Sequence, residues 1–183
     1  MPFPKRYAEL AARLRVPFGF VVSVLFLILA QPTWASLAIG GALGLAGLGL
    51  RAWAAGHLAK NQQLATSGPF AHLRNPLYIG TLIVGMGFAV AGARVAIGAM
   101  LLAFFVLFYL PVVGEEEGHL RRLFPGYADY ERRVPKFFPR FSAAFPPVER
   151  FRWALYKKNE EYQALAAFVL VMALLAAKLR FSG

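Results

Sequence analysis

Long stretches of the chain carry no charged residue, and these stretches alternate with strongly polar segments. Charges are absent between Arg15 and Arg51, between Arg74 and Arg94, between Arg94 and Glu115, and between Glu161 and Lys178. A helix needs about 20 residues to cross the hydrocarbon core of a bilayer. The first stretch is therefore long enough for two crossings, the next two for one each, and the last for a short one whose ends reach the interface.

This pattern predicts an all-α fold: a polytopic membrane helix bundle of about five transmembrane helices with a cytoplasmic C-terminal cap. We expect one membrane domain over residues 1–183, beginning with an amphipathic interfacial helix in residues 1–15. Four spans should follow within residues 16–113, at about 16–30, 36–57, 77–91 and 94–113. Residues 114–160 would form the cap, and residues 161–183 a fifth membrane helix.

Basic residues indicate the orientation of these helices. Lys and Arg are frequent in the N-terminal arm and in residues 51–76 and 115–160, but scarce in the turns at 31–36 and 92–94. The positive-inside rule then places the N-terminus and the cap on the cytoplasmic side, with the bacterial inner membrane as the expected location. Five spans would put the C-terminus outside. Lys178 and Arg180 favour the alternative, in which the last helix lies on the membrane.

Composition narrows the possible functions. Of the 183 residues, 58% are hydrophobic and 16% are charged, with a net charge of +11. We assign the excess of basic residues to lipid head groups, because no nucleic-acid-binding motif accompanies it. The chain has no cysteine, which excludes disulfides, thiolate nucleophiles and cysteine-held iron–sulfur clusters. Its three histidines lack the spacing of metal ligands, so no metal site is expected.

Two further patterns concern packing. Gly40 and Gly44 form a GxxxG pair inside the second expected span, which predicts a close contact with another helix. Residues 124–153 cannot form one long helix, because prolines interrupt them. These are Pro125, Pro135, Pro139, Pro146 and Pro147.

The residues that could carry chemistry lie at the ends of the spans. Residues 66–70 are turn-forming, and Arg74, Asn75 and Tyr78 then lead into the third span. The third and fourth spans form a hairpin that returns the chain to the same membrane face at Glu115, Glu116 and Glu117. We therefore expect Arg74 and Tyr78 to lie close to these carboxylates, in a site suited to a zwitterion.

Each of these features also has a simpler explanation. Arg74 could bind lipid phosphates, and three consecutive glutamates could be the solvated end of a helix. Carboxylates at the C-terminal end of a helix are electrostatically unfavourable, however, so this placement calls for a reason.

Two motifs resemble a known superfamily, the isoprenylcysteine carboxyl methyltransferases and phospholipid methyltransferases. Its first motif reads roughly T-x-G-P-Y and then R-H-P-x-Y-x-G. It is similar here to Thr66-Ser67-Gly68-Pro69-Phe70 and Arg74-Asn75-Pro76-Leu77-Tyr78-Ile79-Gly80. The second is similar to Glu116-Glu117-Gly118-His119-Leu120, followed by Phe124, Tyr127, Tyr130, Val134-Pro135 and Pro139.

The resemblance implies a membrane methyltransferase that uses S-adenosyl-L-methionine, releases S-adenosyl-L-homocysteine, and accepts a lipophilic substrate from the bilayer. It implies that Arg74 orients the acceptor. If the acceptor is an amine, it must first lose a proton, and Glu116 or Glu117 is then the candidate base. Residues carried over as cofactor-binding are Thr66, Gly68, Pro69, Phe70, His72, Asn75, Tyr78, Glu116, Glu117, Tyr127 and Tyr130. The chain departs from the pattern at Asn75, where many relatives have His, and a proton-accepting role is doubtful there.

Two other functions compete with this one. An NADPH-dependent reductase related to sterol reductases would share the C-terminal arrangement, although such chains are usually longer. A non-enzymatic membrane scaffold would bind no cofactor. The acceptor stays open among a prenylated cysteine, an isoprenoid acid and a lipid amine, and so do O- versus N-methylation and the oligomeric state.

Overall fold

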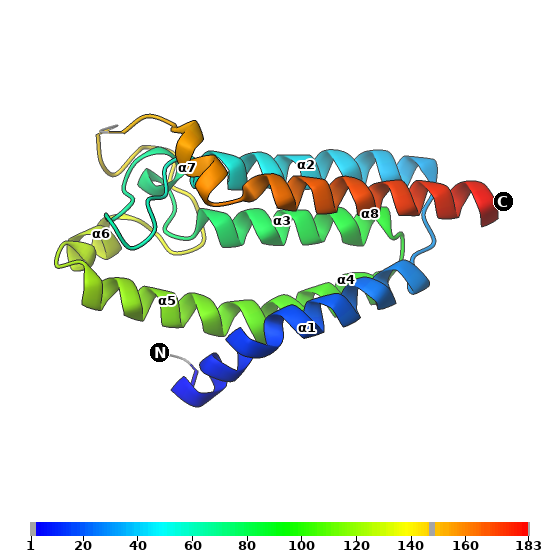
Figure 1. Cartoon of the computed structure of the whole chain (residues 1–183), viewed down its shortest axis with the longest axis horizontal. Coiled ribbons are helices and arrows are strands. Elements are labelled where there is room, and N and C mark those ends of the chain that lie inside the picture. Colours follow the sequence, from blue (N-terminus) through cyan, green and yellow to red (C-terminus); the bar gives the residue numbers. More distant parts are fainter. Residues whose placement is uncertain (1–2, 147–148, 183) are drawn as a thin grey trace.

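The computed structural model describes residues 3–146 and 149–182, and all regular elements in this part of the chain are helices (Figure 1). The long helices are α1 (Lys5–Leu29), α2 (Trp34–Ala55), α3 (Pro76–Ala91), α4 (Val95–Phe104), α5 (Leu110–Leu123) and α8 (Glu161–Ser182). The short ones are η1 (Gly68–Ala71), η2 (Phe105–Tyr109), α6 (Tyr127–Arg133) and α7 (Trp153–Lys158). Pro147, one of the expected helix breakers, lies outside the described residues.

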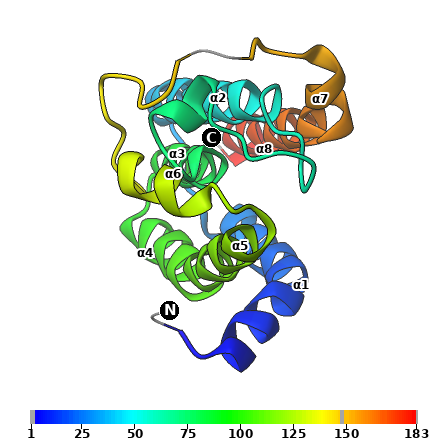
Figure 2. The ribbon, with the colours of Figure 1, turned by 90° about the vertical axis from the view of Figure 1, so that its left-hand side faces the viewer.

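The long helices form two layers (Figures 1 and 2). One layer contains α2, α3 and α8, and the other contains α1 and the continuous α4–η2–α5 helix. The α3–α4 turn joins the layers at one end, where α3 contacts α4. At the other end α3 and α5 diverge, and the short helices and loops of the cap lie across the opening (Figure 2).

Within the first layer, α2 and α3 approach almost to backbone contact. A Cβ atom added at Gly40 would lie 2.6 Å from the Ala91 nitrogen, and one at Gly47 would lie 2.7 Å from the Gly80 oxygen. At Gly44, the added atom would lie 2.6 Å from Cζ of Phe168 in α8 and would collide with its ring. The predicted close contact through Gly40 and Gly44 is therefore confirmed, because a side chain at either position would collide with a neighbouring helix.

Arg51 links the cap-side ends of the three helices in this layer. Arg51 of α2 donates from Nε and Nη2 to the carboxylate of Glu161, the first residue of α8, at 2.9 and 2.8 Å. Its Nη1 donates to Thr81 Oγ1 of α3 at 2.5 Å. A two-point guanidinium–carboxylate pair has a fixed geometry, so it holds the start of α8 against α2 and α3.

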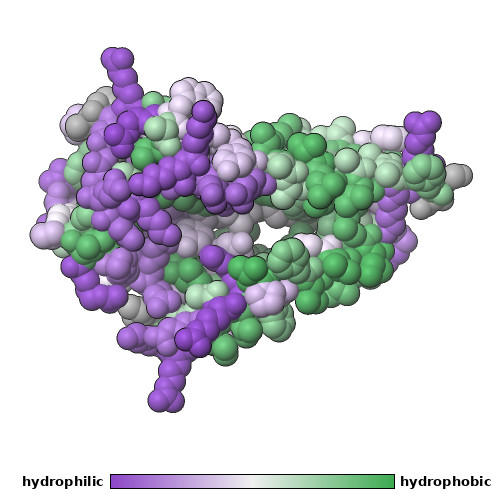
Figure 3. Space-filling model, in the orientation of Figure 1, coloured by the Kyte–Doolittle hydropathy of each residue, from purple (hydrophilic) through white to green (hydrophobic). Residues whose placement is uncertain are grey.

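The fold is that of an integral membrane protein. Within the described residues, four helices are long and apolar enough to cross a bilayer: Lys5–Leu29, Trp34–Ala55, Val95–Leu123 and Glu161–Phe181. The fifth, α3, is apolar but has only 16 residues, about 24 Å of helix. Figure 3 shows hydrophilic residues gathered at the cap end and hydrophobic residues over most of the remainder.

Two helix boundaries differ from those expected. The separate interfacial helix expected in residues 1–15 is instead the first part of α1, which continues through Pro17. This part is held against the other helix of its layer. Tyr7 donates from its hydroxyl to the Leu107 carbonyl at 2.9 Å, and Arg15 lies over the Tyr109 ring. The Leu107 carbonyl needs a donor because Pro111, four residues later, has no N–H.

The other difference concerns the fourth expected span, which continues past residue 113 to Leu123. The three glutamates therefore lie on α5 before its last turn, and Arg121 and Arg122 occupy that turn. Basic side chains are favourable at this end of a helix, so the electrostatic objection to the glutamates does not apply.

The last helix runs the full length of the first layer. It starts at the cap and brings the C-terminus to the opposite end (Figure 1). There Lys178 donates to the carbonyls of Leu27 and Ile28 at 2.7 and 2.8 Å, which are among the last carbonyls of α1. This contact explains a basic residue far from the cap and favours the spanning alternative for α8.

Candidate functional site

The two sequence motifs meet at the cap end, where α3 and α5 diverge. Tyr78 donates to Glu116 Oε2 at 2.6 Å, and Asn75 Nδ2 donates to Glu117 Oε1 at 3.1 Å. Arg74 Nη1 lies 3.7 Å from Glu117 Oε1. The proximity predicted from the helical hairpin is therefore confirmed.

Local sequence explains how these side chains are presented. Pro76 begins α3, where a missing N–H leaves no helical hydrogen bond unmade, and Asn75 is the residue just before it. The backbone of Arg74 is fixed from the cap, since its N–H donates to the Pro135 carbonyl at 2.9 Å. Glu116 and Glu117 are successive residues of α5, so they point in different directions and reach different partners.

A cavity of about 430 Å³ lies between these elements. Its lining combines apolar, aromatic and charged side chains. The residues of the two motifs and their neighbours that line it include Phe70, Arg74, Asn75, Tyr78, Glu115, Glu116, Glu117, His119, Arg122, Tyr127 and Tyr130. The loop after α2 adds residues 58, 60, 61 and 63–65. Figure 3 shows the molecule hollowed between its two layers, near the boundary between the hydrophilic end and the hydrophobic remainder. A ligand in this region can have one part among polar groups and another part near lipid.

Glu117 is at the centre of a charge network. The residue is 8% exposed, and besides Asn75 and Arg74 it accepts a hydrogen bond from Lys136 Nζ at 2.7 Å. A buried carboxylate needs this many partners to offset its lost hydration. The network thus ties α5 both to the start of α3 and to the cap.

Lys136 and Glu131 were missed in the sequence reasoning. Glu131 of α6 lies 2.9 Å from Arg74 Nη1 and accepts two hydrogen bonds from Arg121. The hydrogen bonds from Arg121 are the main reason why the pKa of Glu131 is lowered. The only sequence signal for them was an excess of charges near Pro135 that the motifs did not account for. Even so, Arg74 Nε is buried without a hydrogen-bond partner in the described part of the chain.

Two tyrosines form the cap side of the cavity. Tyr127 is 1% exposed, and burial raises its pKa to about 12. Burial also raises the pKa of Tyr130, whose hydroxyl donates to the Phe70 carbonyl at 2.9 Å. Both hydroxyls therefore stay protonated at neutral pH. The hydrogen bond from Tyr130 to Phe70 also holds the first motif against α6.

Four of the predicted cofactor-binding residues do not line the cavity: Thr66, Gly68, Pro69 and His72. Gly68 has a φ of +57° and lies against the ring of His57, where an added Cβ would be 2.5 Å from Cδ2. His57 is buried beside Ser67 Oγ, at 3.2 Å from Nδ1, and burial lowers its pKa. Gly68 and Ser67 of the first motif therefore pack against His57 on the side away from the cavity, and they support the turn without lining the cavity.

His72 instead contacts the cap. Its Nδ1 lies 2.9 Å from the Arg140 carbonyl, so the tautomer that carries a proton on Nδ1 makes a hydrogen bond there. Among the described residues, no three or more His, Cys, Asp or Glu side chains lie together in a group that could hold a metal ion.

Comparison with known proteins gives one family and two relatives. The family described as phospholipid methyltransferase matches residues 18–126. The cobalt-zinc-cadmium resistance protein CzcN of Cupriavidus metallidurans is 39% identical over 106 residues, 55% of this chain and 49% of the relative. The nickel-cobalt-cadmium resistance protein NccN of Alcaligenes xylosoxydans xylosoxydans is 37% identical over 116 residues, 60% of this chain and 54% of the relative.

The chain thus spans about half the length of the curated relatives it matches. No solved structure shows a significant match.

Proposed function

Because the chain belongs to the phospholipid methyltransferase family, we propose that it transfers the methyl group of S-adenosyl-L-methionine to a lipophilic acceptor that enters from the bilayer. The family supports a methyl transfer in the membrane. The cofactor, the acceptor class and the residue roles are the parts that we add.

One observation carries the proposal: both motifs converge on one cavity beside the apolar body of the helices. Tyr78 with Glu116 and Asn75 with Glu117 are paired across the space between α3 and α5. Methyl transfer from a sulfonium is an in-line displacement, in which positioning of donor and acceptor supplies much of the rate. A cavity with polar groups at one end and lipid at the other suits that task.

The residues present fit the cofactor. S-adenosyl-L-methionine supplies an activated methyl group on a positive sulfur, and it carries an ammonium and a carboxylate. Glu116 and Glu117 would hold the positive groups. The buried Nε of Arg74, which lacks a hydrogen-bond partner among the described residues, would suit an anionic oxygen of a ligand. Phe70, Tyr127 and Tyr130 would surround the remainder.

Two acceptor chemistries make different demands on the protein. A carboxylate acceptor needs only an orienting cation and the exclusion of water, and Arg74 would supply the cation. An amine acceptor must first lose a proton, and Glu116 would take it. Because Arg74 already lies between Glu117 and Glu131, we expect its charge to be shared with these groups when an acceptor is present.

We further propose that the cap lies in the cytoplasm and that the membrane is the bacterial inner membrane. Basic residues are concentrated at the cap end, whereas the turns at the opposite end carry few. The positive-inside rule favours this orientation.

Calorimetric titration of the purified protein with S-adenosyl-L-homocysteine tests the proposal, and NADPH serves as the control. We expect saturable binding of the first compound and none of the second. Binding of NADPH alone would indicate the reductase, and binding of neither would indicate a scaffold. Acceptors can then be screened with a labelled methyl donor, and Arg74→Ala should strongly reduce turnover of a carboxylate acceptor.

A further inference from the structure

A loop of the cap is fixed at both ends against the first motif. At its start, the Arg74 N–H donates to the Pro135 carbonyl at 2.9 Å, and Asn75 Nδ2 donates to the Lys136 carbonyl at 3.3 Å. At its other end, the Arg140 N–H donates to the His72 carbonyl at 3.1 Å. The segment between these contacts is therefore held in place and projects outward.

The projecting segment exposes two large aromatic side chains. Phe138 is 85% exposed and Phe141 is 106% exposed, although the neighbouring Phe137 is partly covered. Removal of a phenylalanine side chain from water is favourable, because it hides a large apolar surface. A fixed loop that presents two of them to solvent therefore calls for a surface that covers them.

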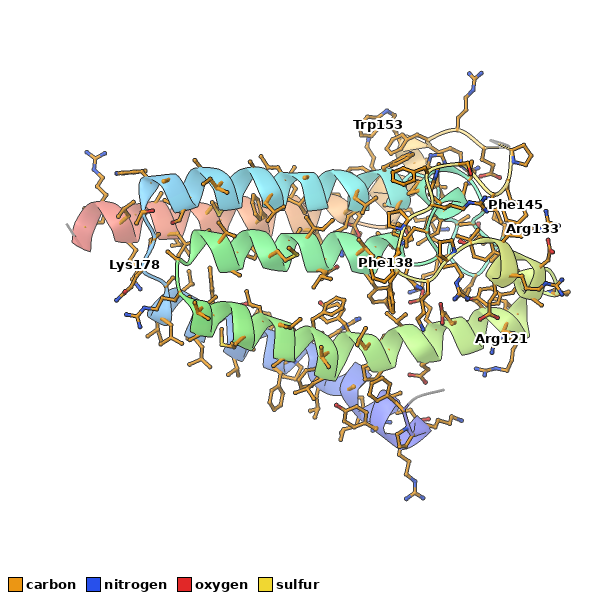
Figure 4. All side chains as sticks on the ribbon, turned by 180° about the vertical axis from the view of Figure 1, so that it is seen from behind. Arg121, Arg133, Phe138, Phe145, Trp153 and Lys178 are labelled. Carbon is orange, nitrogen blue, oxygen red and sulfur yellow. The ribbon has the colours of Figure 1, made fainter. Side chains whose placement is uncertain are left out.

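The position of the loop identifies that surface. Figure 4 shows Phe138 beside the start of α3, whereas Arg133 and Phe145 lie farther out on the cap. Since α3 is only 16 residues long, its first turn must lie close to one boundary of the hydrocarbon core. Phe138 is thus level with the membrane interface, where aromatic side chains are favourable.

Charge points the same way. Arg140, between the two phenylalanines, is exposed, and its Nη1 donates to the Arg133 carbonyl at 2.9 Å. The Arg133 side chain is also exposed. Basic groups beside exposed aromatic rings match an anionic head-group layer, in which the rings enter the acyl boundary and the guanidinium groups contact phosphates.

We propose that residues 137–141 form a membrane-interface anchor, with Phe138 and Phe141 inserted into the leaflet on the cap side. The anchor is independent of any enzymatic activity. It would matter for the cavity, however, because Lys136, the residue that holds Glu117, belongs to the same loop. Contact with lipid would thus hold in place a segment that contacts Glu117 of the cavity lining.

The absence of cysteine allows a direct test in the full-length protein. Phe138→Cys and Phe141→Cys are spin-labelled and reconstituted into vesicles of phosphatidylcholine with a minor share of phosphatidylglycerol. Collision of the label with oxygen, which concentrates in lipid, is compared with collision with water-soluble nickel ethylenediaminediacetate. Leu102→Cys, on the exposed apolar face of α4, is the membrane reference, and Ala128→Cys, exposed on α6, is the aqueous reference.

We expect both loop labels to collide preferentially with oxygen, as at Leu102, and to lose this preference when the vesicles are replaced by a short-chain amphipol. Aqueous behaviour at both positions, as at Ala128, would overturn the proposal. So would a label at Phe138 that stays aqueous while Phe141 inserts, since Phe138 is the residue level with α3. Protection from both reagents would indicate a protein partner or a second copy and would overturn it as well.

Discussion

The two faces of α3 are packed very differently: one is in close contact with α2, and the other borders a cavity. One face lies on α2, where glycines on both helices bring the backbones together and leave no room for a Cβ atom at Gly40, Gly47 or Gly87. The other face carries Tyr78 and looks toward α5 across a cavity of about 430 Å³. The short helix is therefore fully supported from one side only.

The difference shows how a small membrane protein can keep an open site. A helix that must border a cavity loses packing on that side, and in lipid no hydrophobic effect compensates for the loss. Close contact on the opposite side, together with the Arg51–Glu161 pair at the cap-side end, supplies the missing rigidity. The polar network around Glu117 then bridges the open side instead of apolar packing.

The largest expected effect comes from breaking the tight face. Gly40→Val would press a branched side chain onto the backbone of α3 near Ala91, which cannot move aside as a flexible side chain could. We therefore expect destabilisation well beyond the roughly 1–3 kcal/mol typical of overpacking, to the point that no folded protein is obtained. Thermal unfolding in detergent measures it. Gly49→Val is the control, because no atom of the described residues lies within 4 Å of a Cβ there. Equal melting temperatures of the two variants would contradict the account.

On the open face, the strongest effect should come from Glu117. Removing its carboxylate leaves Lys136 and Arg74 without their shared partner, and loss of one member of a buried charge network costs about 3–5 kcal/mol. Under the proposed function, Glu117→Ala should weaken S-adenosyl-L-homocysteine binding by about a hundredfold or more in calorimetry. Glu115→Ala, which alters the cavity lining without removing an ion pair seen in the described residues, should change it little.

A smaller loss is expected at Tyr78. Tyr78→Phe removes one hydrogen bond to Glu116 but keeps the ring, and a hydrogen bond to a charged group is worth about 1.5–3 kcal/mol. We expect cofactor affinity or turnover to fall at least about tenfold. Tyr109→Phe is the matched control, since its ring packs against Tyr78 without a hydroxyl contact in the described structure. Similar losses in both variants would mean that the hydroxyl–carboxylate bond has no special role.

The smallest effect should be a pH dependence of stability that comes from His57, which follows α2 at the cap-side end of the first layer. Burial lowers the pKa of His57 from 6.5, so the unfolded chain binds a proton more readily than the folded one. The resulting stability is complete above pH 6.5 and decreases as the pH falls toward the lowered value. Melting temperatures between about pH 7.5 and pH 5.5 should therefore fall less in His57→Leu than in the wild type. Identical slopes would show that His57 does not titrate in this window.

Much of the fold follows from local sequence. Charge-free stretches identified five apolar helices, because the length of a span is fixed by the bilayer and not by its neighbours. The GxxxG pair predicted a close helix contact. The hairpin between Pro76 and Glu117 was enough to place Tyr78 near Glu116, since two antiparallel spans must return the chain to the same face.

Helix ends and loop contacts could not be predicted in this way. Residues 1–15 and 16–30 looked like two elements because their polarity differs, yet the backbone of α1 has no reason to stop between them. The extension of α5 to Leu123 was hidden because the apolar pattern ends at residue 113, where the helix leaves the apolar body but continues.

The number of apolar helices, the end at which the polar residues gather, and the two motifs that face each other there can all be read from the sequence. The folded chain was needed to see that Lys136 and Glu131 join the network, that His72 and Gly68 support the site without lining the cavity, and that Phe138 projects outward at the level of the start of α3. The cause of this difference is that the bilayer imposes a strong and uniform pattern on the spans. The cap, in contrast, is arranged by individual hydrogen bonds and ion pairs between residues far apart in the chain, which no local pattern encodes.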